Sequence, residues 1–329
     1  MRQVWGEPVL VTGGAGFIGS HLVDRLLDEG ATVTVLDNMS TGRRANLAHR
    51  SGEPHLQIVE GTILDPAVVD AQIARHPLVF HLAAAVGVRH IVDDPLGSVL
   101  TNVRGTEHVL AAAHASGARV VFASTSEVYG RSQAVPFRED SERVLGPTWV
   151  DRWSYSTAKA LDEHLAFAYA KRGLRVSIVR YFNSYGPRID ERGYGSVIAR
   201  FASQALRGQP ITVHGEGTQT RCFTFVGDTV RGTLIAARVD EAISQVFNIG
   251  SSYEVSIIDL ARRIKELLGS SAPIQFVPYE SYYPQGFQDT LRRVPDVTRA
   301  AEVLGFRTEV DLPTGLERTL AWCREHFTA

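Results

Sequence analysis

A glycine-rich segment between an apolar run and an amphipathic helix pattern constrains the fold of this chain more than any other feature. The apolar run spans 9–12, and the segment that follows reads TGGAGFIGSHLVDRLL. Gly14, Gly16 and Gly19 have the spacing G-x-G-x-x-G, and Gly13 offers an overlapping G-x-x-G-x-x-G. Glycines let the backbone turn tightly, and the N–H groups of the helix that follows then face the turn. Such strand–turn–helix units are typical of parallel α/β sheets.

Short apolar runs alternate with longer helical patterns over the first 180 residues, as expected for repeated βαβ units. The expected strands span 9–12, 32–37, 56–60, 78–82, 119–124 and 176–180. Several of them consist almost entirely of Val, Ile, Leu, Phe and Ala, which is typical of strands covered by helices on both faces. We therefore predict an α/β fold with a doubly wound parallel sheet.

An acidic residue at the end of the second expected strand specifies the ligand of the glycine turn further. Asp37 lies 18 residues beyond Gly19. Its carboxylate can accept hydrogen bonds from ribose hydroxyls, and it would repel a 2′-phosphate. The combination predicts a Rossmann-type dinucleotide site for NAD. Arg43 and Arg44 lie nearby and keep NADP open as the alternative, because guanidinium groups bind phosphate well.

The pattern changes after residue 180, where Gly and Pro are frequent at 186–188, 193–195 and 214–220. Helices are expected at 226–238, 257–268, 297–304 and 313–326. We assign residues 1–180, together with roughly 226–250, to the dinucleotide-binding Rossmann domain. Residues 181–225 and 251–329 are assigned to a smaller, mostly C-terminal α/β substrate-binding domain.

Composition points to a small-molecule enzyme rather than to a nucleic-acid or membrane partner. The net charge is -2, with 44% hydrophobic and 21% charged residues, and no apolar run is long enough to span a bilayer. Cys222 and Cys323 are the only cysteines, so neither a disulfide framework nor a metal site is expected, and both cysteines should be buried. We expect an unprocessed cytoplasmic protein.

Two groups of polar residues are candidates for catalysis. Tyr155 and Lys159 lie four residues apart at the start of an expected helix, so both side chains rise from one face. An ammonium beside a phenol lowers the phenol pKa, which suits a base that removes a hydroxyl proton. Thr125, Ser126 and Glu127 follow the strand at 119–124, at the edge of the sheet where ligands bind. Capping of a turn is their alternative role.

Five segments in the same order resemble the extended short-chain dehydrogenase/reductase family of sugar-nucleotide enzymes: GGAGFIG at 13–19, HLAA at 81–84, TNVRGT at 101–106, STSEVYG at 124–130 and YSTAK at 155–159. The resemblance implies that Tyr155 is the base, that Lys159 binds the nicotinamide ribose, and that Thr125 holds a substrate oxygen. Many relatives carry an acid where Thr62 stands. The cofactor-binding residues that it implies are Gly13, Gly16, Phe17, Ile18, Gly19, Asp37, Asn38, Thr62, Ile63, Leu82, Ala83, Ala84, Asn102, Tyr155 and Lys159.

Within that family the Thr-Ser-Glu triplet is similar to that of UDP-glucuronate decarboxylases, as are the segments 146–159, 180–190, 219–224 and 281–296. The resemblance implies oxidation at carbon 4, loss of carbon dioxide, and full or partial hydride return to give UDP-xylose or the 4-keto pentose. It places Arg293, Glu127 and Ser126 at the reacting centre. The residues that it implies for substrate binding are Arg152, Asn183, Arg221, Tyr282 and Arg293, with Asn183 and Arg221 on the diphosphate and Tyr282 near the nucleotide.

Two other functions remain open. A 4-epimerase acting on a UDP-sugar, UDP-glucuronate or UDP-glucose, would use the same Tyr155, Lys159 and NAD. A non-catalytic NAD-binding regulator is the third candidate, against which the intact Tyr155 and Lys159 argue. The resemblance also implies a homodimer, with the helices around 95–116 and 156–172 forming a four-helix interface.

Overall fold

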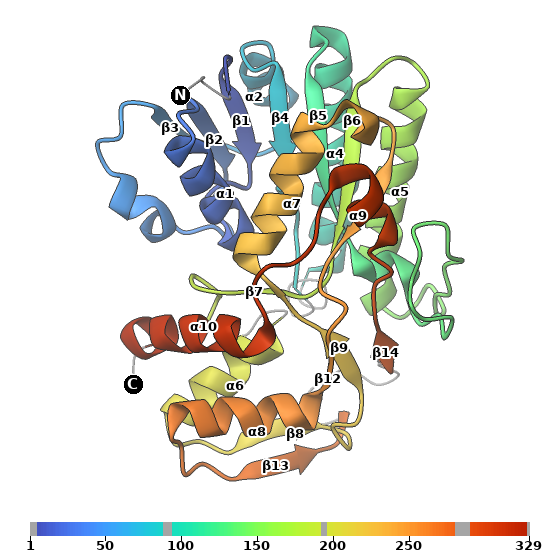
Figure 1. Cartoon of the computed structure of the whole chain (residues 1–329). Helices are drawn as coiled ribbons and strands as arrows, with labels where there is room; N and C mark the ends of the chain where they lie inside the picture. The colour runs from blue at the N-terminus through green and yellow to red at the C-terminus, as the bar shows by residue number, and fades with distance from the viewer. Residues whose placement is uncertain (1–4, 88–93, 192–195, 280–289, 328–329) are drawn as a thin grey trace.

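The larger part of the molecule is built on one parallel sheet. The computed structural model describes residues 5–87, 94–191, 196–279 and 290–327. Seven strands lie in the order β11-β6-β5-β4-β1-β2-β3, all parallel (Figure 1). They are β1 (Val9–Thr12), β2 (Val33–Asp37), β3 (Leu56–Glu60), β4 (Leu78–His81), β5 (Arg119–Thr125), β6 (Val176–Tyr181) and β11 (Val246–Ile249). Strand order reverses between β1 and β4, which opens a crevice at the carboxyl ends of the strands.

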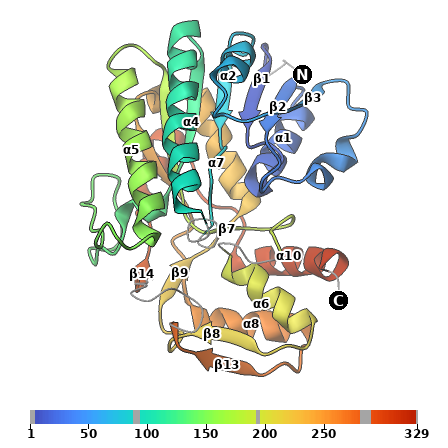
Figure 2. The same ribbon diagram turned by 180° about the vertical axis from the view of Figure 1, so that it is seen from behind.

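Helices cover both faces of this sheet, as Figures 1 and 2 show from opposite sides. One face carries α1 (Phe17–Asp28), α7 (Val226–Arg238) and α9 (Thr298–Leu304), and the other carries α2 (Pro66–Ile73), α4 (Pro95–Ser116) and α5 (Arg152–Ala170). Alternate strand residues enter alternate cores: Val9 and Val11 pack with the first group, and Leu10 packs with the second. The expected strands are continuously apolar for this reason, and the predicted doubly wound sheet is confirmed.

The smaller part lies below the sheet in Figure 1. Its helices are α6 (Val197–Leu206), α8 (Ile257–Leu268) and α10 (Leu312–His326). Their apolar faces enclose a separate core that includes Phe201, Leu260 and Leu316. Its strands are β7 (Ser184–Tyr185), β8 (Ile211–His214), β9 (Thr220–Cys222), β10 (Thr224–Phe225), β12 (Glu254–Ser256), β13 (Ile274–Val277) and β14 (Arg292–Arg293), and the 3₁₀ turns of the chain are η1 (Arg44–Arg50), η2 (Ser126–Tyr129) and η3 (Asp240–Ala242).

The predicted elements agree with the structure to within one residue at each end. The six expected strands and four expected helices are all present. Strand β11 and the strands of the smaller part were not predicted. Strands of two to four residues show no periodicity that separates them from loops. One of them, β14, places a residue of the candidate site.

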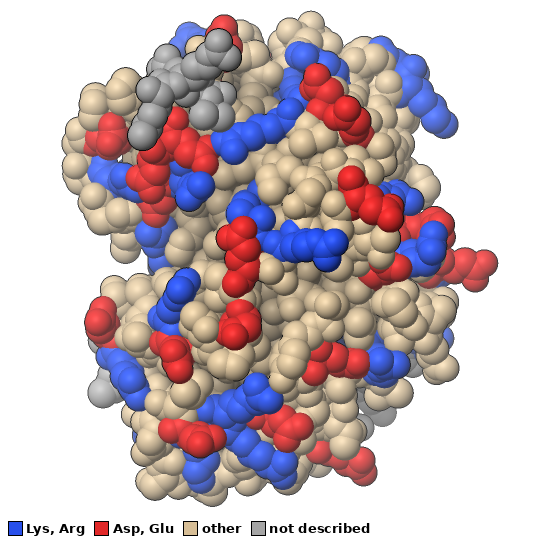
Figure 3. Space-filling model, viewed as in Figure 1, with Lys and Arg blue, Asp and Glu red and all other residues tan. Residues whose placement is uncertain are grey.

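The surface in Figure 3 carries basic and acidic side chains interspersed, without a field of one sign. A notch at its left edge marks the junction of the two parts. Within the described part of the chain, no helix combines the length and the apolar character needed to cross a membrane. Cys222 and Cys323 are free and buried, as predicted.

A buried ion pair ties α5 to the sheet. The guanidinium of Arg180, at the end of β6, donates from Nε and Nη2 to the two carboxylate oxygens of Glu163 at 2.9 and 2.6 Å. Ser124 donates to the same carboxylate at 2.5 Å, and Arg180 also donates to the hydroxyl of Tyr129 at 2.8 Å. Because all of these groups are buried, removal of one partner leaves the other without compensation.

We therefore expect Glu163→Gln to lower the free energy of unfolding by about 3–5 kcal/mol, the usual effect of breaking a buried pair. Urea unfolding followed by circular dichroism measures it. Arg138→Gln is the matched control, since it breaks an exposed pair with Asp140 and should leave the urea midpoint unchanged. A loss no larger in Glu163→Gln than in the control would contradict the role of this pair.

Candidate active site

The glycine turn approaches the neighbouring strands so closely that side chains are excluded. Gly13 has φ +73°, and a Cβ there would lie 2.7 Å from the backbone nitrogen of Ala83. A Cβ on Gly19 would collide with the carbonyl oxygen of Gly13, and one on Gly14 would lie 2.7 Å from Val35. Helix α1 begins at Phe17 without a side-chain cap, so its first N–H groups remain directed at the turn. This cradle fits the diphosphate of a dinucleotide.

Asp37 holds this turn from the side. Its carboxylate accepts hydrogen bonds from the backbone N–H of Ala15 at 2.9 Å and of Met39 at 2.8 Å. Burial raises the pKa of Asp37, and these two bonds act in the opposite direction. Arg43 pairs with Asp190 at 3.1 Å and Arg44 with Glu60 at 2.6 Å. Both guanidiniums are thus engaged by carboxylates, which favours NAD over NADP as predicted.

A cleft of about 590 Å³ runs from this turn along the carboxyl edge of the sheet. It brings together most of the residues that the sequence predicted. Those on the cofactor side are Gly13, Gly16, Phe17, Ile18, Gly19, Asp37, Asn38, Ile63, Leu82, Ala83 and Ala84. Those on the substrate side are Thr125, Ser126, Glu127, Arg152, Tyr155, Asn183 and Arg293.

Four predicted residues do not line the cleft. Thr62 uses its hydroxyl in a local turn, accepting from the N–H of Leu64 at 3.2 Å. Asn102 is buried and bonds the backbone of Ala85 through both ends of its amide, so it shapes the cleft wall from behind. Arg221 donates to the carbonyl of Thr290 at 2.7 Å. The fourth is Lys159, which is buried and paired with Asp162. Tyr282 lies outside the described residues.

Further residues that line the cleft were not predicted from the sequence. Ser98 and Thr101 enter from α4, and Ser184, Ile189 and Asp190 enter from the segment after β6. A signal was present for the second group, because 184–190 lies within a segment that resembles the decarboxylases. Further lining residues are Ser40, Thr41, Ala85, Val86, Gly87 and Ser196.

Tyr155 is surrounded by groups that keep its phenol protonated. Burial raises the pKa of Tyr155, Glu127 and Asp162 raise it further, and a hydrogen bond with Thr125 lowers it. We expected Lys159 to lower this pKa, but it contributes no resolved effect. Its ammonium lies 3.5 Å from the carboxylate of Asp162 instead. From the protein groups alone, the phenol is therefore a proton donor at neutral pH.

Glu127 is bracketed by arginines. Arg293 Nη1 lies 2.6 Å from one carboxylate oxygen, and Arg152 Nη2 lies 3.7 Å from the other. Burial acts to raise the pKa of Glu127, but Arg293, Arg152 and Arg221 outweigh it and hold this pKa below its usual value. Arg293 is placed by β14, which pairs with β9 so that Arg293 lies opposite Arg221. The Nε of Arg293 is buried and has no hydrogen-bond partner among the described residues, so it retains a donor for another acceptor.

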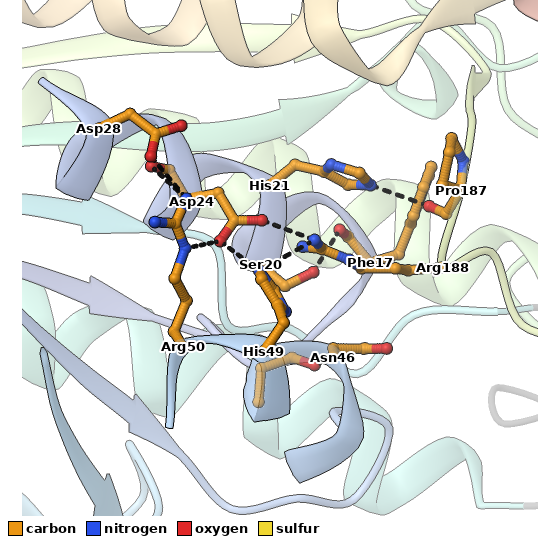
Figure 4. Close-up of polar contacts among 11 residues, drawn as sticks. Phe17, Ser20, His21, Asp24, Asp28, Asn46, His49, Arg50, Pro187 and Arg188 are labelled. Atoms are coloured by element: carbon orange, nitrogen blue, oxygen red, sulfur yellow. Dashed lines mark hydrogen bonds and ion pairs between the residues drawn. The ribbon is translucent and has the colours of Figure 1, made fainter. Parts of the chain in front are cut away.

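A clasp formed by residues 186–190 joins the segment after β6 to α1 (Figure 4), and its residues Ile189 and Asp190 line the cleft. Arg188 donates to Asp24 of α1 at 2.6 Å, and the His21 ring bonds the carbonyl of Pro187 at 2.9 Å. Asp24 also binds Arg50 at 2.8 Å. Arg188 has φ +65°, a conformation that non-glycine residues rarely adopt, so its ion pair has to compensate local strain. Asp24 is thus the anchor of the clasp.

Comparisons with known proteins agree with this geometry. Residues 9–250 match the NAD dependent epimerase/dehydratase family. The chain is 44% identical to a UDP-N-acetyl-alpha-D-glucosaminuronate decarboxylase of Bacillus cytotoxicus, over 96% of this chain and 97% of that one. It is 36% identical to UDP-glucuronic acid decarboxylase 1 of Xenopus tropicalis, over 97% of this chain and 72% of that one.

A solved structure of UDP-glucuronic acid 4-epimerase from Bacillus cereus, in complex with UDP-glucuronic acid and NAD, has a TM-score of 0.86 and 29% identity. The alignment covers 97% of this chain and 99% of that one. The chain therefore belongs to the NAD dependent epimerase/dehydratase family, and NAD is its cofactor.

The clasp makes a prediction about cofactor retention. Asp24→Asn keeps the size of the side chain but leaves Arg188 and Arg50 without its charge, so we expect NAD to dissociate about tenfold faster, equivalent to about 1.4 kcal/mol. Displacement of bound NADH, followed by its fluorescence, measures this rate. Asp28→Asn is the control, because Asp28 pairs with Arg50 alone and does not contact the clasp. Equal dissociation rates in the two variants would show that the clasp does not retain the cofactor.

Proposed function

We propose that this protein decarboxylates a UDP-linked hexuronate through oxidation at carbon 4, and that UDP-glucuronate is the substrate. One observation carries the proposal: Arg293 and Arg152 both meet Glu127 in the cleft beside Tyr155. Guanidiniums at this place in the cleft can bind a sugar carboxylate through charge-assisted hydrogen bonds, whereas a neutral sugar offers them no anion.

The names of the relatives support the same reaction. The Bacillus cytotoxicus and Xenopus tropicalis proteins are both named as decarboxylases of a UDP-linked uronate. Their substrates share the nucleotide and the sugar carboxylate and differ at carbon 2. Because the identity to the first is greater, the 2-acetamido uronate is a candidate substrate beside UDP-glucuronate.

Oxidation at carbon 4 makes the loss of carbon dioxide possible. NAD, when bound, supplies the hydride acceptor. Tyr155, once ionised to the phenolate, takes the proton of the carbon 4 hydroxyl, and the Thr125 hydroxyl holds the oxygen in place. The resulting ketone is β to the carboxylate, so it can accept the electron pair of the breaking carbon–carbon bond as an enolate.

The arginines and Glu127 manage the charge and the proton at carbon 5. The substrate carboxylate competes with Glu127 for Arg293 and Arg152 and is held by them until the bond breaks. Glu127 then loses the contacts that keep its pKa low, and burial raises that pKa. It can therefore carry the proton that carbon 5 receives, with Ser126 beside it. Hydride return gives UDP-xylose, and release before return gives the 4-keto pentose with NADH.

Carbon-6-labelled UDP-glucuronate tests the proposal. We expect release of the label as carbon dioxide, and a product lighter by that group in mass spectrometry. The 2-acetamido analogue is assayed in parallel to decide between the two uronates. A product that keeps the label would make the protein a 4-epimerase, and no reduction of NAD by any nucleotide sugar would favour the regulator.

Two substitutions should separate the two chemical steps. Tyr155→Phe removes the proton acceptor, so we expect turnover to fall on the order of 100-fold or more while NAD still binds. Arg293→Ala should slow the release of carbon dioxide more than the reduction of NAD, because it acts on the carboxylate. The two rates are measured as labelled gas and as NADH absorbance. Equal slowing of both steps by Arg293→Ala would contradict its assigned role.

We also infer a homodimer in which α4 and α5 pack against their copies as four helices. Leu96 of α4 and Leu161 of α5 are 69% and 44% exposed in the single chain, so both are available for an apolar contact there. The free, buried cysteines are in keeping with the reducing conditions of the cytoplasm, where we place the protein.

A further inference from the structure

The ammonium of Lys159 lies in the core, not at the surface of the cleft. The residue is 2% exposed, and its Nζ lies 3.9 Å from the centre of the Phe122 ring of β5. Burial lowers the pKa of Lys159, and the charge of Asp162 opposes this most strongly, followed by that of Glu163. Glu163 is engaged by Arg180. Asp162 is thus the carboxylate on which the charge of Lys159 chiefly depends.

Asp162 has little else to bind. It is 0% exposed, and neither carboxylate oxygen makes a short hydrogen bond to a described residue. Its contacts are the ammonium of Lys159 at 3.5 Å and the hydroxyl of Thr106 on α4. Burial raises the pKa of Asp162 to about 6, so it is mostly ionised at neutral pH. A buried carboxylate so sparsely bonded is costly to keep, which calls for a function beyond packing.

A chain of hydrogen bonds behind Asp162 runs back to the glycine turn. The Thr106 hydroxyl bonds His81 Nε2 at 3.1 Å, and His81 Nδ1 bonds the Thr12 hydroxyl at 2.8 Å. The Thr12 oxygen accepts from the N–H of Ala83 at 3.2 Å. Ala83 is the residue against which Gly13 packs.

The direction of this chain follows from its last acceptor. An ionised carboxylate can only accept, so the Thr106 hydroxyl directs its proton toward Asp162 and accepts the proton of His81 Nε2. His81 Nδ1 is then the acceptor of the Thr12 hydroxyl. Burial and, to a smaller extent, the charge of Lys159 lower the pKa of His81 to about 3, so the ring is neutral and has a single tautomer. Every donor between the cofactor turn and Asp162 therefore points the same way.

We propose that Asp162 is a positioning residue for the oxidation step: its carboxylate, oriented by the chain from Ala83 through Thr12, His81 and Thr106, fixes the Lys159 ammonium one helical turn after Tyr155 on α5. The proposal rests on the NAD-dependent oxidation proposed above. Asp162 does not line the cleft, and it acts by keeping Lys159 charged and in place. A phenolate at Tyr155 forms against the charges of Glu127 and Asp162, and the ammonium one helical turn away on α5 acts in the opposite direction.

The charges around the pair determine the direction of the pH effect. Asp162 and Glu163 on α5 favour the ammonium, His81 on β4 is neutral, and Glu127 on η2 acts on Tyr155. Removal of the Asp162 charge lowers the pKa of Lys159. The protonated fraction is then lost at lower pH, and the alkaline limb of the oxidation rate should move to lower pH with it.

The lysine count allows a direct measurement. The chain contains only three lysines, Lys159, Lys171 and Lys265. Lysine labelled with carbon-13 at the ε position gives three signals, and Lys159→Arg identifies the buried one. We expect the pKa of Lys159 in the NAD-bound protein to fall by about one unit or more in Asp162→Asn. Lys171 and Lys265 are internal controls that should not move, and an unshifted Lys159 would overturn the proposal.

The kinetic experiment tests whether the rate of NAD reduction changes with the protonation of Lys159. Reduction of bound NAD is followed across pH with UDP-glucuronate, its 2-acetamido analogue and UDP-glucose, so that a wrong choice of sugar does not spoil the comparison. We expect the alkaline limb of Asp162→Asn to move by the same interval as the lysine titration. A lowered Lys159 pKa with an unchanged pH profile of NAD reduction would show that Asp162 has only a structural role and would end the proposal.

Variants of Thr106 keep the test decisive if Asp162→Asn does not fold. Thr106→Val removes the hydroxyl that orients Asp162 and should shift both titrations in the same direction by a smaller amount, while Thr106→Ser restores them. Identical titrations of Thr106→Val and Thr106→Ser would overturn the proposal. If the wild-type protein reduces NAD with none of the three nucleotide sugars, the proposed function fails. The lysine titration then still decides whether Asp162 controls the pKa of Lys159.

Discussion

The candidate site depends on the parallel arrangement of the sheet. Because all seven strands run in one direction, their carboxyl ends meet at one edge, and the loops that follow β1, β2, β4, β5 and β6 lie around one cleft (Figure 1). If the strands moved apart, the apolar side chains on both buried faces of the sheet would be exposed, so the loops at the strand ends stay close together. The glycine turn, Asp37 and the Thr125–Glu127 triplet are therefore held together by the same packing that stabilises the fold.

Charge is distributed unevenly behind and within this cleft. In the core, Arg180 is matched by Glu163 and Lys159 by Asp162, so that each cation has its own carboxylate. In the cleft, Glu127 faces more than one arginine. The paired charges stabilise α5, and the arginines of the cleft are the groups that we propose to bind an anionic substrate. A single helix, α5, connects the two, because it carries Arg152 and Tyr155 at its start and Lys159, Asp162 and Glu163 further along.

Sequence reasoning succeeded where a residue's role follows from its neighbours along the chain. The glycine spacing, the acid at the end of the second strand and the polar triplet after the fifth strand all depend on local order, and the structure places them on the cleft. It was wrong about the Tyr155 pKa, because the ammonium expected beside the phenol has a carboxylate three residues further along the helix as its partner. Spacing along a helix shows that two side chains share a face, but it does not show with which group a charged side chain pairs.

The sequence by itself determined the doubly wound sheet, the NAD turn and the identity of the candidate acid–base residues, since hydrophobic periodicity and glycine spacing are local properties. Only the tertiary structure decided that Arg293 meets Glu127, that Arg188 closes over α1, and that a chain of hydroxyls and one imidazole links Ala83 to Asp162. The hydrogen bonds among these contacts join residues from 25 positions apart, as in His81 and Thr106, to 166 positions apart, as in Arg293 and Glu127. Burial and charge in three dimensions select such partners, and no pattern along the chain encodes them.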